Sequence, residues 1–236
     1  KTPMTSYHKF NRIEKTHILI AKMLEGNKVA LVSDAGMPGI SDPGEELVLA
    51  AYEAGIKVTV LPGATALTTA VVLSRLPTGR FSFEGFLPTG KKERDGILEQ
   101  LKITTKPTVF YEAPHRLLKT LQMLSHAVGG DRKISVCREL TKKYEEVLMF
   151  SLTEAMEYYK KNAPRGEFVL VLDGRSQKDI HKENMAKWME LSEEQHVNYY
   201  VKQGFTKKEA IKMVAADRGV SKREIYRKVS VHTILL

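Results

Sequence analysis

VALVSDAGMPGISDPG, at Val29 to Gly44, is the stretch that decides the fold, because a short apolar run leads directly into a loop of glycines, prolines and small polar residues. The run Val29–Val32 has no polar alternation, which predicts a strand covered on both faces, as in a parallel sheet. Asp42 is predicted to cap the helix that follows, with Pro43 at its first position and Glu45 completing a capping box. The loop would then lie at the carboxyl end of a strand, where open α/β sheets bind their ligands.

A second unit of the same kind follows in the chain. Lys57–Leu61 is a β-branched run that predicts another strand, and Pro62–Ala66 is a turn of small residues before an apolar helix. Two consecutive strands that end in such loops predict one shared site. Neither loop contains G-x-G-x-x-G or G-K-[ST], so no dinucleotide or nucleoside triphosphate cradle is indicated. A long structural turn is the alternative.

The remaining periodicity predicts strands at 81–86, 108–111, 133–136, 147–150 and 167–172. Helices are predicted at 12–24, 66–74, 91–102, 114–127 and 153–161. Short strands that alternate with helices in two successive groups are typical of an α/β protein with two lobes, here residues 1–78 and 79–174.

Composition limits the class of protein. The chain has 236 residues, 42% of them hydrophobic, which is enough for ordinary cores. Its single cysteine excludes an intramolecular disulfide and a Cys-rich zinc site, so a reducing compartment is expected. We find no signal peptide and no apolar run of the roughly 20 residues that span a bilayer. We therefore expect a cytoplasmic protein that does not enter a membrane.

The tail differs in charge from the rest of the chain. From Arg175 onward it holds 13 Lys and Arg against 8 Asp and Glu, a net charge of +5 out of +9 for the whole sequence. Residues 175–190 read as a linker, and 191–236 as three capped helices whose last two have helix-turn-helix spacing. Four cations on the final helix suit phosphate contact: Lys222, Arg223, Arg227 and Lys228. A dimerisation or docking unit is the alternative for this region.

Charged residues also gather next to predicted strand ends. Glu112 and Arg116 follow one strand as either a structural ion pair or a ligand contact. Lys91 and Lys92 begin a predicted helix. They are interpreted either as part of its solvated face or as side chains that bind phosphate. The stretch from 138 to 146 is unusually dense in titratable groups.

Six motifs in order resemble the tetrapyrrole methylase family, and within it the ribosomal RNA small subunit methyltransferases. They are SDAGMPGISDPG at 33–44, LPGATAL at 61–67, FEGFLP at 83–88, YEAPHRL at 111–117, CRELTKKYEE at 137–146 and RGEFVLVLDG at 165–174. The resemblance implies two α/β lobes with S-adenosyl-L-methionine in the cleft between them, and a homodimer. It also implies methylation of the ribose 2′-hydroxyl of a cytidine in small-subunit (16S) ribosomal RNA, free or in the assembled subunit.

The family's binding positions are carried over by motif. The cofactor is expected to contact the first loop, the second turn and the second lobe, at Asp34, Ala35, Gly36, Pro62, Gly63, Ala64, Thr65, Ala66, Tyr111, Glu112, Ala113, Gly166 and Glu167. Charge and position in the chain, rather than the family motifs, lead us to expect RNA at Lys91, Lys92, Arg116, Lys222, Arg223, Arg227 and Lys228. The family's first strand and its glycine- and proline-containing loop have no counterpart here, so we expect a chain that is truncated or numbered from its first ordered residue.

Catalysis should need no metal, because a sulfonium methyl is already electrophilic and the enzyme mainly has to orient the ribose oxygen and assist loss of its proton. The hypothesis assigns that work to Glu139, Lys142 and Glu146. Two other functions fit parts of the chain. A small-molecule methylase acting on a tetrapyrrole would have no use for a basic tail, and a non-enzymatic nucleic-acid-binding regulator leaves the two cofactor turns without a role.

Overall fold

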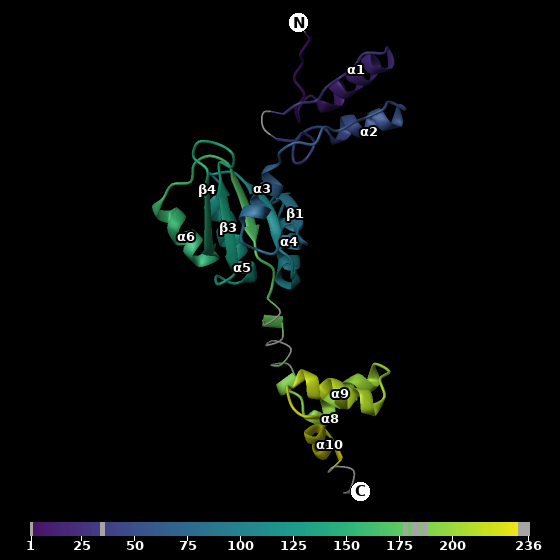
Figure 1. The fold of residues 1–236 in the computed structure, drawn as a ribbon, viewed down its shortest axis with the longest axis vertical. Coiled ribbons are helices and arrows are strands. Elements are labelled where there is room, and N and C mark those ends of the chain that lie inside the picture. The colour runs from purple at the N-terminus through teal and green to yellow at the C-terminus, as the bar shows by residue number, and fades with distance from the viewer. Residues whose placement is uncertain (1, 34–35, 177–178, 181–184, 186–187, 231–236) are drawn as a thin grey trace. The chain divides into compact units, whose positions relative to one another are not determined.

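The computed structural model describes residues 2–33, 36–176, 179–180, 185 and 188–230. Within them, five strands form one mixed sheet in the order β1-β2-β5-β3-β4 (Figure 1). The strands are β1 Ser82–Phe86, β2 Thr108–Glu112, β3 Lys133–Arg138, β4 Glu146–Ser151 and β5 Phe168–Leu172. Each agrees within two residues with a strand predicted from the sequence.

β5 lies at the centre of the sheet. It pairs antiparallel with β2 on one side and with β3 on the other, whereas β1 and β2 are parallel and β3 and β4 form an antiparallel hairpin. All five β5 residues, FVLVL, are buried. A continuous apolar run is what a strand covered on both faces requires.

Helices cover both faces of this sheet (Figure 1). On one face, α4 Lys91–Ile103, α5 Leu117–Val128 and α6 Leu152–Lys161 bury leucines against Phe110, Phe168 and Leu170. On the other face, α3 Ala66–Leu73 packs Ala70 and Val71 onto the alternate strand residues, among them Val109, Val169 and Val171. The sheet and these helices form the expected α/β core.

Two predicted strands are wrong. Neither Val29–Val32 nor Lys57–Leu61 forms a β-ladder among the described residues, and the side chains of Val32 and Leu61 are 75% and 87% exposed. An apolar run predicts a buried strand only where a neighbouring strand can pair with its N–H and C=O groups. Within the described ranges these two segments have no such neighbour.

The predicted cap of the following helix is also wrong. α2 Glu45–Glu53 has Gly44 at its N-cap and no side-chain capping bond, so Asp42 and Pro43 belong to the preceding turn. α1 Arg12–Leu24 has the predicted bounds and packs on α2, with Arg12 Nη1 2.6 Å from Glu46 Oε1.

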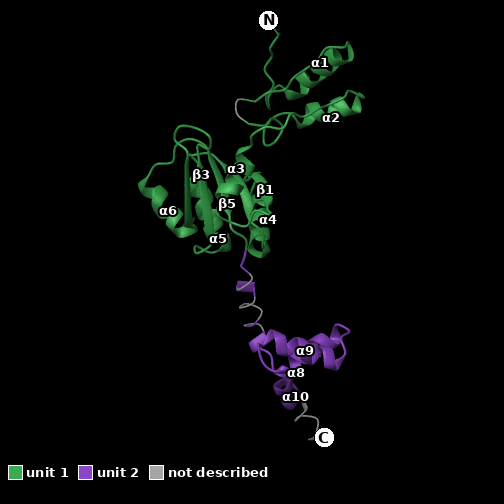
Figure 2. Cartoon of the chain, in the orientation of Figure 1, with its two compact units in different colours: residues 1–174 green, residues 175–236 purple. Residues whose placement is uncertain are grey.

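Contacts divide the chain into two compact units, residues 1–174 and 175–236 (Figure 2). The second unit, which we call the tail, contains α8 Glu193–Lys202, α9 Lys207–Asp217 and α10 Lys222–Ser230. Ser192 and Thr206 form capping boxes at α8 and α9, and Ser221 Oγ accepts the Glu224 N–H at the start of α10. Among the described helices, none is long and apolar enough to cross a membrane.

A buried histidine organises one side of the tail. His196 is fully buried, and its ring stacks on Trp188 with centroids 4.0 Å apart. Its Nδ1 accepts from Arg218 Nε at 3.3 Å, its Nε2 lies 3.3 Å from Asp217 Oδ2, and Tyr200 donates its hydroxyl to that same carboxylate. Burial lowers the pKa of His196 against the opposing effect of Asp217, with Arg218 acting in the same direction as burial.

We therefore expect the tail to lose stability as the pH falls below about 6.5, because the unfolded state takes up the His196 proton more readily than the folded state. Trp188 is the only tryptophan, so its fluorescence during urea unfolding at several pH values follows the tail alone. His196→Gln should flatten this dependence between pH 7 and 5. The exposed His126, on α5, provides the control His126→Gln, which should leave the dependence intact. Equal slopes in the His196→Gln variant and the unmodified chain would contradict the assignment.

Candidate functional site

A cleft of about 640 Å³ lies within residues 1–174. It is lined by residues from 31–33 and 36–43, the start of α3, the ends of β1 and β2, the loop after β3 and the start of β5. The cleft thus brings together segments that are far apart in the sequence.

The two predicted cofactor turns meet at this cleft. Gly36 has a φ of +77°, and a Cβ built on it would lie 3.2 Å from the Ala64 carbonyl oxygen. This close approach, together with the left-handed backbone, explains why glycine occupies the position. Gly85, at a bulge in β1, faces Ser41 of the same loop, since a Cβ there would lie 3.1 Å from Ser41 Oγ.

The second turn ends in a helix N-terminus that faces the cleft. Thr65 caps α3, with its Oγ1 accepting the Thr68 N–H at 3.2 Å. Ala64, Thr65 and Ala66 all line the cleft, so small side chains leave the first turn of α3 accessible. Backbone N–H groups and the helix dipole favour a negatively charged group at such a position.

Aromatic rings form part of the cleft wall next to α3. Tyr111 at the end of β2 packs edge-on against Phe83 and Phe86, with ring centroids 5.0 and 5.9 Å apart. Burial raises the pKa of Tyr111, and a backbone hydrogen bond from Leu67 opposes this rise. The ring therefore presents a neutral, largely apolar surface next to α3.

Glu112 and Arg116 form a structural pair at the end of β2. The Glu112 side chain is fully buried and accepts hydrogen bonds from Ala113 N at 2.7 Å and from Thr120 Oγ1. Arg116 Nε lies 3.6 Å from the same carboxylate, and its Nη2 donates to the Leu87 carbonyl. These contacts fasten the end of β2 to α5 and to the segment after β1, and they leave Arg116 little freedom to contact RNA.

The predicted catalytic stretch contains a closed network of charges. Lys142 Nζ lies 3.2 Å from Glu139 Oε1 and 2.9 Å from Glu167 Oε2. Glu139 Oε1 also accepts the Glu167 N–H at 2.9 Å, and the Glu139 N–H donates to the Glu167 carbonyl. Glu139 and Thr141 have φ values of +50° and +65°, a conformation that costs a non-glycine residue about 1–2 kcal/mol. The surrounding contacts hold this loop in a strained backbone at the edge of the cleft.

The network favours the charged forms of Glu139 and Lys142. Hydrogen bonds from the Glu167 backbone and from Lys142 lower the pKa of Glu139, and those from Lys142 to Glu167 and Glu139 raise the pKa of Lys142. A general base has to be unprotonated at working pH and basic enough to take a proton. The lowered pKa of Glu139 and the raised pKa of Lys142 both disfavour that role, and the catalytic assignment stays a prediction.

Glu146 is separated from this network. It lies opposite Arg138 in the ladder between β3 and β4, and Arg138 Nε is 3.5 Å from its Oε2. The cross-strand ion pair accounts for its position, and Glu146 does not line the cleft.

Other predicted site residues fall into three groups. Gly36, Ala64, Thr65, Ala66, Tyr111, Glu112, Ala113, Lys142 and Glu167 line the cleft. Pro62, Gly63, Gly166 and Glu139 are outside its lining, although Gly166 and Glu139 adjoin it through Glu167. Asp34 and Ala35 lie outside the described residues.

Several lining residues escaped the sequence reasoning. Leu140 and Thr141 belong to the dense stretch, and Phe86 to the FEGFLP motif, but the spacing gave no reason to select them. Tyr7 also lines the cleft, and its hydroxyl bonds Thr16 Oγ1 in α1, a contact with no sequence signal.

The predicted RNA-binding cations differ in whether a carboxylate of the chain pairs with them. Lys91 lies 2.7 Å from Asp95, one turn along α4, and Lys228 lies 2.8 Å from Glu193 of α8. No ion pair within the described part of the chain engages Lys92 or Arg227. Among the described residues, no group of three or more His, Cys, Asp or Glu is placed to hold a metal ion.

Comparison with known proteins identifies relatives along nearly the whole chain. Residues 1–156 match the family described as Tetrapyrrole (Corrin/Porphyrin) Methylases. The chain is 48% identical to Ribosomal RNA small subunit methyltransferase I of Halalkalibacterium halodurans over 225 residues, which cover 95% of this chain and 77% of that protein. It is 44% identical to the Bacillus subtilis protein of the same name, over 96% of this chain and 77% of that protein.

Solved structures share the fold at much lower identity. The methyltransferase CobJ matches 73% of this chain and 74% of its own, with a TM-score of 0.57 and 20% identity. Uroporphyrin-III C-methyltransferase from Thermus thermophilus, solved with S-adenyl homocysteine, matches 69% of this chain and 73% of its own, with a TM-score of 0.51 and 17% identity. These similarities establish the fold.

Gly166 offers a test of the charge network. Its φ is +84°, and a Cβ there would lie 2.6 Å from Glu139 Cγ, whereas a Cβ on Gly55, with a φ of +70°, would meet nothing within 4 Å. Gly166→Ala should therefore lower the free energy of unfolding by about 1–3 kcal/mol more than Gly55→Ala, because only the first adds a collision to the backbone strain. Urea unfolding followed by circular dichroism measures both. Adding Glu139→Ala to Gly166→Ala should recover part of the loss, and equal losses at the two glycines would refute the contact.

Proposed function

The chain belongs to the tetrapyrrole methylase family, and within it to the group of Ribosomal RNA small subunit methyltransferase I; from this we propose that it methylates the ribose 2′-hydroxyl of a cytidine in small-subunit (16S) ribosomal RNA. The methyl donor is S-adenosyl-L-methionine. The observation that carries the proposal is that Gly36, the start of α3, the end of β2 and the start of β5 meet in one cleft.

The cleft fits this cofactor in size and chemistry. Its volume of about 640 Å³ lies within the roughly 300–1,000 Å³ of small-molecule sites. Gly36 leaves bare backbone beside the Ala64 carbonyl, and the N-terminus of α3 suits the carboxylate of an amino acid moiety. Tyr111 and Leu140 supply apolar surface for a heterocycle. When bound, S-adenosyl-L-methionine supplies an electrophilic methyl group on a sulfonium.

In this proposal Glu139 and Lys142 are positioning residues. Lys142 lines the cleft and remains protonated between two carboxylates, so it holds the loop after β3 against the chain that enters β5. The strained backbone at Glu139 and Thr141 is stabilised by these contacts. Precise support of this kind affects rate because small displacements of a reacting pair are costly. The proposal gives Glu146 a structural role beside Arg138.

The basic tail has a place in the same function. A net charge of +5 from residue 175 onward suits a polyanionic substrate. The homodimer and the cytoplasmic location, which the family resemblance and the composition suggest, stay predictions.

The function is tested by incubating the chain with S-adenosylmethionine labelled in the methyl group and, separately, small ribosomal subunits, naked ribosomal RNA or a porphyrinoid. We expect label in the RNA. Because a 2′-O-methyl group blocks alkaline cleavage of the adjoining phosphodiester, the label should survive in an alkali-resistant dinucleotide that contains cytidine. Label in the porphyrinoid alone would overturn the proposal, as would labelled RNA that alkali digests completely to mononucleotides.

Substitutions at Lys142 separate positioning from proton transfer. Arginine keeps the charge but cannot be deprotonated, so Lys142→Arg should keep methyl transfer within about tenfold, with an unchanged pH profile. Lys142→Met should lower kcat roughly 10- to 100-fold through loss of the ion pairs. If Lys142 were the general base, both variants would lose about 10²- to 10⁴-fold. The exposed cation Lys160, on α6, provides a control, Lys160→Met, that lies outside the cleft and outside the predicted RNA-binding residues.

A further inference from the structure

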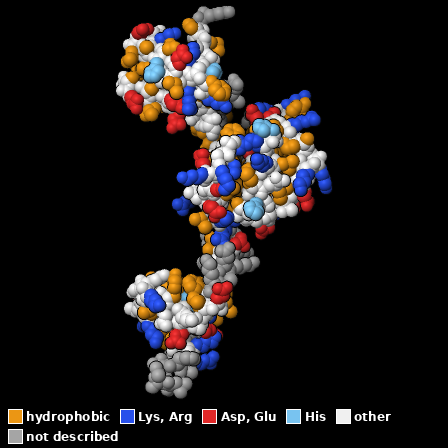
Figure 3. Space-filling view, turned by 180° about the vertical axis from the view of Figure 1, so that it is seen from behind, with side chains coloured by type: hydrophobic (Ala, Val, Ile, Leu, Met, Phe, Trp, Pro, Cys, Tyr) orange, Lys and Arg blue, Asp and Glu red, His pale blue; other side chains and the backbone are white. Residues whose placement is uncertain are grey.

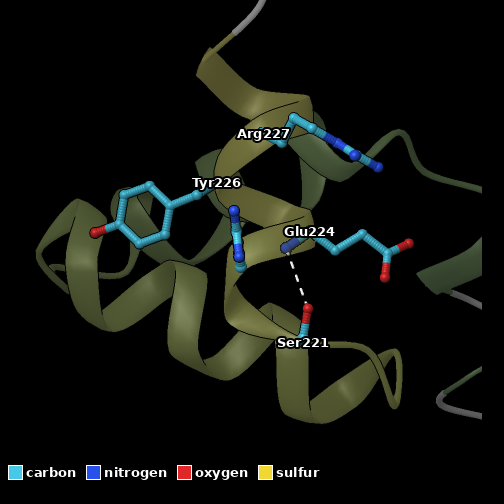
Figure 4. A pocket seen from close by; sticks show the side chains of 5 residues that line it. Ser221, Glu224, Tyr226 and Arg227 are labelled. Atoms are coloured by element: carbon cyan, nitrogen blue, oxygen red, sulfur yellow. Dashed lines mark hydrogen bonds between the residues drawn. The ribbon is translucent and has the colours of Figure 1, made fainter.

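One face of α10 is exposed and does not pack into the core of the tail. Ile225 and Val229 are 1% and 4% exposed and enter the tail core, whereas Tyr226 is 44% exposed. A shallow hollow on this face is lined by Ser221, Arg223, Glu224, Tyr226 and Arg227. Figure 4 shows the Tyr226 ring standing away from the helix, with Arg227 extending on another side. A large aromatic ring is thus presented to solvent among cations.

The cations on this face are not all equivalent. Lys228 lies 2.8 Å from Glu193 and 3.6 Å from Glu224, so its charge is already matched within the tail. Among the described residues, no carboxylate lies within 4.0 Å of the charged groups of Lys222, Arg223 or Arg227. Figure 3 shows Lys and Arg side chains at the lower end of the tail, where α10 lies.

Spacing places these free cations next to the ring. Lys222 and Arg223 precede Tyr226 by four and three residues, which puts all three on one side of the helix. Arg227 follows directly and borders the same hollow, but its side chain extends to the other side of the helix (Figure 4). A flat group lying on Tyr226 would therefore have Lys222 and Arg223 beside it, and a strand that continues around the helix would reach Arg227.

This combination suits an unpaired nucleotide better than a duplex. The major groove of an RNA duplex is deep and narrow, so a helix such as α10 cannot enter it as a helix enters the DNA major groove. Duplex phosphates alone would need cations but no exposed aromatic ring. Unpaired RNA bases, in contrast, stack on aromatic side chains while Arg and Lys hold the neighbouring phosphates.

We propose that α10 binds a single-stranded segment of RNA, with a base stacked on Tyr226 and the adjoining phosphates held by Arg223 and Arg227. The site deepens the proposed function, on which the choice of RNA rests. Lys228 stays an internal ion-pair partner of Glu193 and has no direct share in this binding.

The test measures binding of the full chain to a fluorescent unstructured RNA and to an RNA duplex of equal length, at one fixed salt concentration. Tyr226→Ala should weaken single-strand binding roughly 5- to 150-fold and duplex binding by less than about twofold. Tyr226→Phe keeps the ring and should bind within about twofold of the unmodified chain. Tyr226→Leu keeps apolar bulk without a ring and should resemble Tyr226→Ala.

Neighbouring cations give a matched control for the electrostatic part. Arg227→Gln should reduce the slope of log affinity against log salt by about 0.7, the value for one phosphate contact to a single strand. Lys228→Gln, one residue further on, should leave that slope unchanged because its charge is matched by Glu193. Trp188 fluorescence verifies that every variant keeps a folded tail.

Three results would overturn the inference: unchanged single-strand affinity in both Tyr226→Ala and Tyr226→Leu, equal weakening for single strand and duplex, or equal competition by an acidic peptide of the same charge. Methyl transfer to small subunits is measured in parallel. If the unmodified chain transfers methyl but Tyr226 has no effect on RNA affinity, this inference alone fails. If binding depends on Tyr226 but no label reaches ribosomal RNA, the proposed function fails and the RNA-binding surface stands.

Discussion

The hydrogen-bond ladders on both sides of β5 fix the end of β2, the start of β5 and the start of the loop after β3, and all three segments contribute to the cleft. Because β5 is antiparallel to both neighbours, its first residue, Phe168, lies opposite Glu112 at the end of β2 and Arg138 at the end of β3. Three chain segments therefore turn at one edge of the sheet. Burial of each large apolar residue of β5 stabilises this arrangement by about 1.5–3 kcal/mol.

Contacts at this end of the sheet explain why the loop after β3 tolerates two non-glycine residues with left-handed backbone, Glu139 and Thr141. Glu139 exchanges backbone hydrogen bonds with Glu167, which the sheet has already placed, and Lys142 joins their carboxylates. Gly166 lies against the Glu139 side chain, and its missing side chain makes room for Glu139. Glu139, Lys142 and Glu167 therefore hold the loop after β3 in place, and the sheet sets their positions.

Much of the fold follows from local sequence patterns, and the failures have a common origin. Apolar runs such as FVLVL predicted the strands of the sheet, and Thr206 with Glu209 predicted a helix start, because each signal is complete within a few residues. Val29–Val32 carries the same signal as β5 but lacks a described neighbour to pair with. Whether an apolar run becomes a strand depends on segments elsewhere in the chain.

The features of the candidate site also separate into those that local sequence predicts and those that tertiary contacts determine. The family motifs indicated the turns at Gly36 and Ala64, and both line the cleft. No spacing rule pairs Arg116 with the Leu87 carbonyl, 29 residues earlier, or Lys228 with Glu193, 35 residues earlier. The partners of long charged side chains come from tertiary structure, so sequence alone predicts the presence of a charge better than its role.

The two extended segments without ladder partners have a consequence for how copies of the chain behave towards one another. Val29–Val32 and Val58–Leu61 combine β-branched and apolar residues with backbone that joins no β-ladder among the described residues, and such segments are templates for strand addition between molecules. Lys28 and Lys57 stand directly before them. A charge that flanks an apolar segment opposes the stacking of identical strands, so lysines at these two positions work against strand addition between copies.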